Sequence, residues 1–282
     1  MDRIRPPAVA GSFYPSDVKA LGALVDDCLL SNPLGPQAAD LPLPSPIAGM
    51  VPHAGLIYSG PCAAHFYARL KKSDAYRVVI LGVNHRARGH RAALSPWEAW
   101  RTPLGDVPID QALSEFLRAR VSFLECDAHP HSEEHSIEVQ LPFFQRVLRN
   151  FSFLPISLSH LSMEECMNLG AALTELCANE PAGSAPILIL ASSDLSHYLS
   201  PRQTDELDHM VLEKVLALNP VDLFKIVKAK AISMCGVIPA VVMLYAVAGL
   251  GIEGARLLKH YHSGDVSTME KVVGYASVAM VM

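Results

Sequence analysis

The sequence predicts an α/β protein built on a mostly parallel, twisted sheet with helices on both faces. Short apolar runs typical of buried strands occur at residues 47–51, 77–83 and 187–192. Helical patterns alternate with strand patterns along the chain, as expected of parallel strands joined by crossover helices. Half of the 282 residues are apolar and 18% are charged, which is enough apolar material for a substantial core. We therefore expect a single domain over residues 1–282.

Helices are predicted where apolar residues recur at helical spacing or where a capping residue comes first. Ser59 and Pro61 favour a helix start near residue 60, and Asp110 can cap the helix that follows it. Pro142 indicates either a kink or a helix start. The predicted helices cover residues 17–30, 60–70, 111–119, 135–148, 163–177, 204–218 and 221–230, with a long apolar helix after Cys235.

The other segments are predicted to be strands, loops or turns. Further strands are expected at residues 151–159, 255–262 and 272–281, and a tight turn should join the last two. Residues 1–15 should form an extended arm. Loops or turns are expected at residues 33–46, 84–95 and 102–110, the first of which contains five prolines.

The composition excludes two classes of partner. A net charge of −5 leaves no basic surface of the kind that binds nucleic acid. Residues 231–252 carry no charge and are long enough to cross a bilayer, but Gly236 and Pro239 interrupt them, so we predict a buried helix and no membrane association. Six cysteines without a C-x-x-C pair, and an N-terminus without an apolar signal segment, predict reduced thiols in the cytoplasm.

Residues that bind metals or move protons follow the three apolar runs: His53, His85 and the pair Asp194 and His197. Because parallel strands end at the same edge of a sheet, we expect these side chains to converge on one cleft. Asp194 and His197 are three residues apart, so on a helical turn the carboxylate would orient the imidazole as an acid or base. The structural alternative is a lone histidine in each loop, with Asp194 or Ser196 capping the next helix.

Cys235 comes just before the long apolar helix, with Gly236 beside it. The N-terminus of a helix lowers the pKa of a thiol and favours the thiolate, which is the form that binds metal ions. The glycine lets another backbone segment approach closely. The alternative is an inert buried cysteine, which is the more common role of a lone cysteine.

His131, Glu134 and His135 occur in the H-x-x-E-H order of a zinc peptidase. That motif requires both histidines on one continuous helix. Pro130 and Ser132 instead predict a helix that starts after His131, with Ser132 as its N-cap. We therefore expect His135 at the start of a helix, where it faces the cleft and hydrogen-bonds a substrate, and the zinc site is the weaker alternative.

Two further patterns are predicted to be structural. The glycines of residues 249–254 match G-x-G-x-x-G, but they follow a helix and not a strand, so they are expected to end that helix and not to bind a dinucleotide. His260 and His262 alternate on a predicted strand and should lie on one of its faces.

Several longer segments resemble one protein family and occur in its order along the chain. They are VAGSFYP (9–15), VPHAGLIYSG (51–60), LGVNH (81–85), TPLGDVPID (102–110), EEHSIEVQLPF (133–143), SSDLSHY (192–198), MCG (234–236), SGDVST (263–268) and VVGYAS (272–277). On these segments the chain resembles, nearly from end to end, the Memo family, component B of the AmmeMemoRadiSam set.

The resemblance implies a fold similar to that of class III extradiol dioxygenases of the LigB type. Those enzymes hold non-haem Fe(II) with two histidines and a carboxylate. In the Memo family the resemblance implies that a cysteine replaces the carboxylate, which makes His53, His85 and Cys235 the metal ligands. Residues that match the other cleft motifs of the family are Asp194, His197 and His135.

Two imidazoles and a thiolate form a softer donor set than two imidazoles and a carboxylate, and they favour copper, zinc and iron that tolerates a thiolate. We therefore expect one Fe(II) or copper ion, with zinc as a further option, and redox or oxygenase-like chemistry on a small molecule. Ring cleavage is not inferred, because a fold does not imply a function. The alternatives are a vestigial enzyme cleft that binds a peptide or a partner protein, and, less favoured, a zinc hydrolase.

Overall fold

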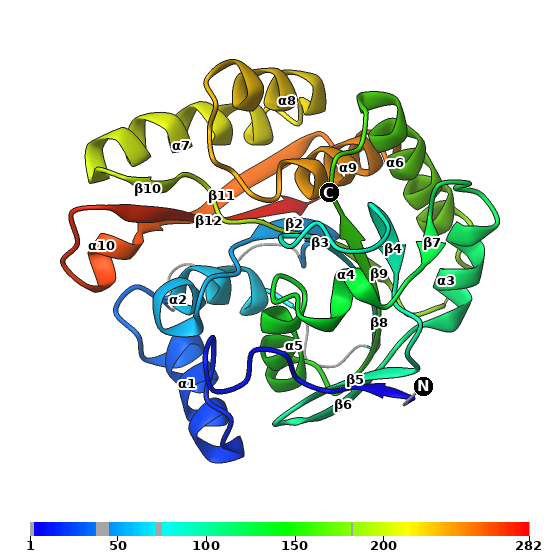
Figure 1. Cartoon of the computed structure of the whole chain (residues 1–282), viewed down its shortest axis with the longest axis horizontal. Coiled ribbons are helices and arrows are strands. Elements are labelled where there is room, and N and C mark those ends of the chain that lie inside the picture. Colours follow the sequence, from blue (N-terminus) through cyan, green and yellow to red (C-terminus); the bar gives the residue numbers. More distant parts are fainter. Residues whose placement is uncertain (1–2, 38–44, 71–74, 182, 282) are drawn as a thin grey trace.

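The computed structural model describes residues 3–37, 45–70, 75–181 and 183–281. In this part of the chain the main sheet has nine strands (Figure 1). Eight of them follow the order β10-β12-β2-β9-β3-β8-β4-β7, and the ninth, β11, pairs with β12 on the edge opposite β2. Four central strands are parallel: β2 (Ala48–Val51), β9 (Ile187–Ser192), β3 (Ala75–Val83) and β8 (Asn150–Leu158). The predicted α/β fold with a mostly parallel sheet is confirmed.

Antiparallel strands extend this sheet at both ends. β12 (Val272–Val281) is antiparallel to β2, to β10 (His197–Leu199) and to β11 (Gly254–His262). At the other end, β4 (Ala92–Leu94) is antiparallel to β8, and β7 (Glu125–Cys126) is parallel to β4. A separate small sheet contains β1 (Ile4–Arg5), β5 (Ala99–Thr102) and β6 (Gly105–Pro108).

Helices cover both faces of the main sheet because its central strands are apolar on both sides. In β3, Val79 and Leu81 face one core, and Val78 and Ile80 face the other. The first core includes α3 (Gln111–Arg118), α6 (Met163–Ala178), α7 (Pro201–Leu216), α8 (Pro220–Ala229) and α9 (Val237–Gly249). The second includes α1 (Val18–Leu30), α2 (Leu56–Tyr67) and α5 (Leu141–Val147), seen on the opposite side of the sheet in Figure 1.

The N-terminal arm is held against the body of the protein by a buried ion pair. Arg5 Nη1 lies 2.5 Å from Glu138 Oε2, and neither side chain is exposed to solvent. The guanidinium also lies 4.0 Å above the ring of Trp100. Glu138 accepts further hydrogen bonds from the amide of Val9 and the hydroxyl of Tyr14. Because the carboxylate sits in the short 3-10 helix Glu138–Gln140, the arm is fixed beside the segment that carries His135.

Ser59 and Pro61 do not open the second helix as predicted. α2 begins at Leu56, and Pro61 lies inside it. The Ser59 hydroxyl instead donates a hydrogen bond of 3.0 Å to the carbonyl of Ala54.

Several segments predicted to be loops or turns contain short regular elements. β4 lies within residues 84–95, the β5–β6 hairpin overlaps residues 102–110, and α10 (Ser263–Val266) replaces the predicted tight turn. Each is only three or four residues long, too short to produce a periodic pattern. Asp110 caps α3 as predicted, and Pro142 marks the start of α5 and not a kink. Part of the loop predicted at 33–46, residues 38–44, lies outside the described residues.

The uncharged segment at 231–252 forms the 13-residue helix α9, which contacts the sheet as well as α6 and α8. Burial by the sheet and by these helices explains why the segment is apolar all around. Within the described ranges, none of the helices combines the length and the apolar character needed to span a bilayer.

Candidate metal centre

Three neighbouring parallel strands end at one cleft. β9 lies between β2 and β3, and the residues two positions beyond the three strand ends, His53, Asp194 and His85, line the same cavity. This cavity has a volume of about 460 Å³, and its other lining residues include His135, His197 and Cys235. The cleft therefore contains all six residues that the sequence predicted for the site.

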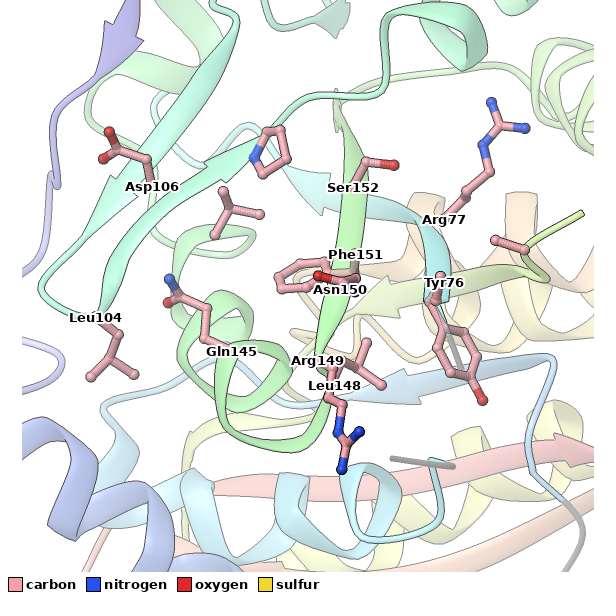
Figure 2. A pocket seen from close by; sticks show the side chains of 14 residues that line it. Tyr76, Arg77, Leu104, Asp106, Gln145, Leu148, Arg149, Asn150, Phe151 and Ser152 are labelled. Carbon is pink, nitrogen blue, oxygen red and sulfur yellow. The ribbon is translucent and has the colours of Figure 1, made fainter. Parts of the chain in front are cut away.

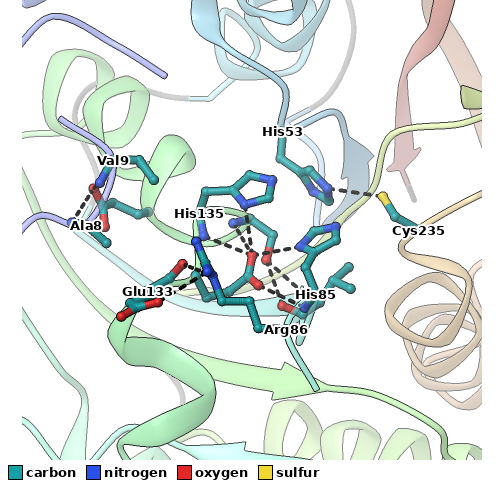
Figure 3. Close-up of polar contacts among 12 residues, drawn as sticks. Ala8, Val9, His53, His85, Arg86, Glu133, His135 and Cys235 are labelled. Carbon is teal, nitrogen blue, oxygen red and sulfur yellow. Dashed lines mark hydrogen bonds and ion pairs between the residues drawn. The ribbon is translucent and has the colours of Figure 1, made fainter. Parts of the chain in front are cut away.

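The imidazole rings of His53, His85 and His135 form the centre of the cleft (Figure 3). The ring of His53 lies edge-on to the other two at centroid distances of 5.2 Å, and His85 and His135 are stacked at 4.6 Å. One nitrogen of each ring lies within 4.8 Å of the nitrogens of the other two, so the group could hold a metal ion. The sequence predicted that His135 faces a substrate. The structure also places it among the possible metal donors, which was not predicted.

Glu134 orients the ring of His85 and lies beside that of His135. Its carboxylate accepts hydrogen bonds of 2.9 Å from Nδ1 of His85 and from the backbone amides of His85 and His135. Nδ1 of His135 lies 3.3 Å from the same carboxylate. The hydrogen bond to the carboxylate holds a proton on Nδ1 of His85 and leaves its Nε2 free to bind a metal, which is the usual arrangement of a metal-binding histidine backed by a carboxylate.

The charge of Glu134 is maintained by these hydrogen bonds. Burial opposes ionisation of this carboxyl, but the hydrogen bond and the charge of His85 outweigh burial and lower its pKa to about 2. In the sequence, Glu134 is identified only as a member of the H-x-x-E-H motif of zinc peptidases. Its role as the carboxylate that orients the ring of His85 was missed, because the sequence does not show that residues 85 and 134 are neighbours.

Cys235 reaches the cleft from the loop that precedes α9. Its Sγ lies 3.1 Å from Nε2 of His53 (Figure 3). The sulfur also accepts a hydrogen bond of 3.3 Å from the amide of Asp194. Gly236 allows this approach, since a Cβ atom there would lie 2.4 Å from Cβ of Ser193. Metal–nitrogen and metal–sulfur bonds of about 2.1 and 2.3 Å at a tetrahedral angle would separate the two donor atoms by about 3.6 Å. The observed 3.1 Å is a hydrogen-bond distance, so the two side chains would have to move slightly apart to share one ion. Cys235 does not belong to the group whose donor atoms all lie within 4.8 Å of one another, which contains His53, His85 and His135.

The start of α9 does not lower the pKa of Cys235 as predicted. Burial, followed by the negative charge of Asp194, raises the pKa of this thiol well above its ordinary value. The helix dipole is outweighed because a buried thiolate would lose its hydration. The thiol therefore keeps its proton in the metal-free protein, and a metal ion that bound to the sulfur would have to displace that proton.

Asp194 and His197 do not form the predicted pair on a helical turn. His197 begins strand β10, and its Nδ1 lies 2.8 Å from the carbonyl of Leu195 and 2.9 Å from that of Ser233. Asp194 instead accepts a hydrogen bond of 2.7 Å from the amide of His53. Burial raises the pKa of Asp194 to about 6. Backbone groups, and not each other, hold both side chains in the cleft wall.

Neither Asp194 nor Ser196 caps the following helix, because Ser200 is the N-cap of α7. Ser196 donates a hydrogen bond of 2.6 Å to the buried carboxylate of Asp208, which also lies 3.1 Å from Nε2 of His260. These contacts agree with the structural role expected of His260.

His131 lies outside the cleft. It belongs to α4 (His129–Ser132), where its Nε2 lies 3.1 Å from the carbonyl of Ala93 and its ring contacts Trp100. Ser132 ends this short helix and does not cap a later one as predicted. His131 and His135 therefore do not share a continuous helix, and the H-x-x-E-H pattern does not form a two-histidine site.

A larger cavity, of about 590 Å³, lies at the opposite ends of β3 and β8 (Figure 2). Its lining includes Tyr76, Arg77 and Asn150 but neither histidine nor cysteine. The charge of Arg77 is matched by Asp110 and Glu180. This cavity is at the opposite ends of the strands from the donor groups of the cleft, so the candidate site is the smaller cavity.

Burial keeps three histidines uncharged in the folded protein. It lowers the pKa of His135 to about 4, that of His131 to about 3, and that of His53 well below its ordinary range. In the unfolded chain each would titrate near its usual pKa of about 6.5. As the pH falls below about 6.5, the unfolded chain binds more protons than the folded protein, and stability decreases. Asp194 acts in the opposite direction, because its raised pKa stabilises the folded protein below about pH 6.

We expect the free energy of unfolding of the metal-free protein to be lower at about pH 4.5 than at about pH 7 by roughly 3–6 kcal/mol, since three histidines outweigh one carboxyl. Urea denaturation at the two pH values measures this difference. A His131→Gln variant keeps an N–H donor for the carbonyl of Ala93 but does not titrate, so its difference should be smaller by about 2 kcal/mol. Equal stability of the wild-type protein at both pH values would contradict this account.

Comparison with known proteins gives matches over almost the whole chain. The sequence model of the family described as Memo-like protein matches residues 5–279. A MEMO1 family protein of Methanopyrus kandleri is 38% identical, over 97% of this chain and 98% of its own length. MEMO1 family proteins of Thermotoga petrophila and Ignicoccus hospitalis are 39% and 40% identical, each over 98% of this chain and at least 98% of their own lengths.

Proposed function

This chain belongs to the Memo family, and from that premise we propose that it binds a single iron or copper ion and uses it in redox or oxygenase-like chemistry. His53, His85 and Cys235 are the proposed ligands. The observation that supports this most directly is that Sγ of Cys235 contacts Nε2 of His53 in the cleft that His85 also lines.

The surroundings of the proposed ligands support this donor set. Glu134 holds the ring of His85 by its Nδ1, and the amide of Asp194 donates a hydrogen bond to Sγ, which stabilises negative charge on the sulfur. A bound iron or copper ion would supply electron transfer and oxygen chemistry. Zinc is a further candidate metal, and His135 is a further imidazole donor within reach of the same centre.

His197, Asp194 and His135 are proposed to move protons and to orient a small-molecule substrate in the cleft. Nδ1 of His197 faces two carbonyl groups, so it carries a proton and leaves Nε2 as the basic nitrogen. Asp194, with a pKa of about 6, can change its protonation state near neutral pH. These groups would serve as the acid and base of the reaction.

The cytoplasm is the proposed compartment. All six cysteines are free, and the side chain of Cys126 is exposed to solvent. Free and exposed thiols persist in a reducing compartment.

A second candidate function is the binding of a peptide or a partner protein, with the metal incidental. Tyr198 supports it, because this residue lines the cleft, is 71% exposed and has a positive φ of 60°. Such backbone strain in a residue that is not glycine is often found at functional sites. If this function holds, a His53→Ala variant should bind its partner as the wild-type protein does.

The metal proposal is tested by elemental analysis of protein purified without oxygen or chelator. We expect about one iron or copper ion per chain, and we expect the His53→Ala, Cys235→Ala double variant to lose it, because the ligands supply the binding free energy. A Cys126→Ala, His129→Ala double variant is the matched control, since both side chains are exposed and lie outside the cleft. The control should keep its metal.

Two results would oppose the metal proposal. Protein that contains no metal and takes up neither Fe(II) nor Cu(I) would contradict it and favour the binding function. Metal that stays bound in the first double variant would show that His53 and Cys235 are not the ligands.

A further inference from the structure

The ring nitrogen of His53 that faces away from Cys235 lies against the hydroxyl of Ser192. Ser192 is the last residue of β9 and is fully buried. Its Oγ has three polar neighbours: Nδ1 of His53 at 2.9 Å, Nε2 of Gln140 at 2.8 Å and the carbonyl of Ser136 at 2.6 Å. A hydroxyl has one proton to donate and two lone pairs that accept, so these three contacts use its full capacity.

The orientation of the Gln140 amide follows from its other contacts. Its nitrogen lies 3.0 Å from the carbonyl of Pro52, which can only accept a hydrogen bond. Its oxygen accepts a hydrogen bond of 2.6 Å from the buried hydroxyl of Tyr67. Gln140 must therefore direct an N–H group, and not its oxygen, toward Ser192.

The remaining protons can then be placed. The carbonyl of Ser136 can only accept, so it takes the single proton of the Ser192 hydroxyl. Gln140 donates to one lone pair of that hydroxyl. The second lone pair can only be used if Nδ1 of His53 carries a proton. An imidazole protonated on Nδ1 has its free lone pair on Nε2, the nitrogen 3.1 Å from Sγ of Cys235.

We propose that Ser192 is a positioning residue that fixes the tautomer of His53 before any metal binds. The buried chain Tyr67–Gln140–Ser192 does for His53 what Glu134 does for His85. The two devices differ in charge, because Ser192 is neutral and Glu134 is a carboxylate. The consequence for metal binding rests on the proposed function, but the tautomer itself is a property of the metal-free protein.

The tautomer can be measured without metal. In protein labelled with ¹⁵N at its histidines, two-bond correlation spectra distinguish a protonated Nδ1 from a protonated Nε2, and a His53→Asn variant assigns the signals. We expect protonated Nδ1 at His53 in the wild-type protein and in Ser192→Thr, which keeps the hydroxyl. Ser192→Ala should give a mixture of the two tautomers.

Ser277→Ala is the matched control. Ser277 is a fully buried serine of β12, and its hydroxyl has no hydrogen-bond partner within the described residues. Its replacement removes the same atom from a neighbouring part of the sheet and should leave the signals of His53 unchanged. Protonated Nε2 at His53 in the wild-type protein would overturn the proposal, and this result needs no variant to fold.

The second measurement is the affinity for Zn(II), by competition with a chelator. We expect Ser192→Ala to bind about 10–100-fold more weakly than wild type, as is typical when the partner of a metal-binding histidine is lost. Ser192→Thr should restore most of the affinity, and Ser277→Ala should not change it. Equal affinity of Ser192→Ala and wild type would overturn the positioning role. If the wild-type protein binds no metal, the proposed function fails, and the spectra still decide the tautomer.

Discussion

Replacement of Glu138 by glutamine should lower the free energy of unfolding by about 3–5 kcal/mol, because it leaves the guanidinium of Arg5 buried without a counter-charge. The loss should be large because Glu138 also serves the amides of Ala8 and Val9 and the hydroxyl of Tyr14. Urea denaturation of the metal-free protein at neutral pH measures the effect.

An exposed ion pair that involves the same arm provides the control. Arg3 and Glu98 are paired, but their side chains are 78% and 55% exposed. Glu98→Gln should therefore cost no more than about 1 kcal/mol. The double variant Arg5→Met, Glu138→Gln should recover part of the loss of Glu138→Gln, since no unpaired charge remains and the amide oxygen of glutamine can still accept from the neighbouring donors. Equal losses for Glu138→Gln and Glu98→Gln would contradict the importance of the buried pair.

Glu134→Gln should weaken the binding of Fe(II) or Zn(II) by about 10–100-fold, measured under anaerobic conditions by competition with a chelator. Glutamine has the size of glutamate, but one of its two ends is an amide nitrogen that cannot accept a hydrogen bond. The carboxylate accepts from Nδ1 and the amide of His85 and from the amides of His135 and Ser136, so the variant must leave at least one donor unsatisfied. The ring of His85 should then lose its fixed orientation.

Glu133→Gln is the control for that experiment. Glu133 precedes Glu134 in sequence, but its side chain is 52% exposed and pairs with Arg86 and Arg88 on the surface. Glu133→Gln removes one negative charge close to the site without removing a hydrogen bond to a ligand. It therefore measures how far the loss of charge alone changes the metal affinity. We expect a change in metal affinity below about threefold, because exposed charges are screened by solvent. If both variants bind metal equally well, Glu134 does not orient the ligands.

The location of the cleft could be predicted from the sequence because the signals are local. His53, His85 and Asp194 each follow an apolar run, and parallel strands always end at one edge of their sheet. Neighbouring strands were therefore enough to bring these residues together. The resemblance of the longer motifs to the Memo family added Cys235, which no strand pattern would have joined to them.

The roles that depend on distant neighbours could not be predicted. Glu134 meets His85 across 49 positions of the chain, and Arg5 meets Glu138 across 133. The pKa of Cys235 was predicted from its place before a helix, but its burial against the loop after β9 decides the direction of the shift. Ser59 and Ser132 are suitable capping residues by type, yet tertiary contacts assign the helix ends to other positions.

The position of β12 has a consequence for how such a site can be inherited. β12 is the last strand in sequence, yet it lies inside the sheet between β2 and β11, and its Val273 lines the cleft. The residues that converge there span the chain from Phe13 to Val273. An EF-hand or a zinc finger has its ligands in one short segment and can be moved between proteins as a module. This site cannot be transferred as a short segment, because its residues are distributed over most of the sequence. A descendant protein that keeps the site must keep nearly the whole chain.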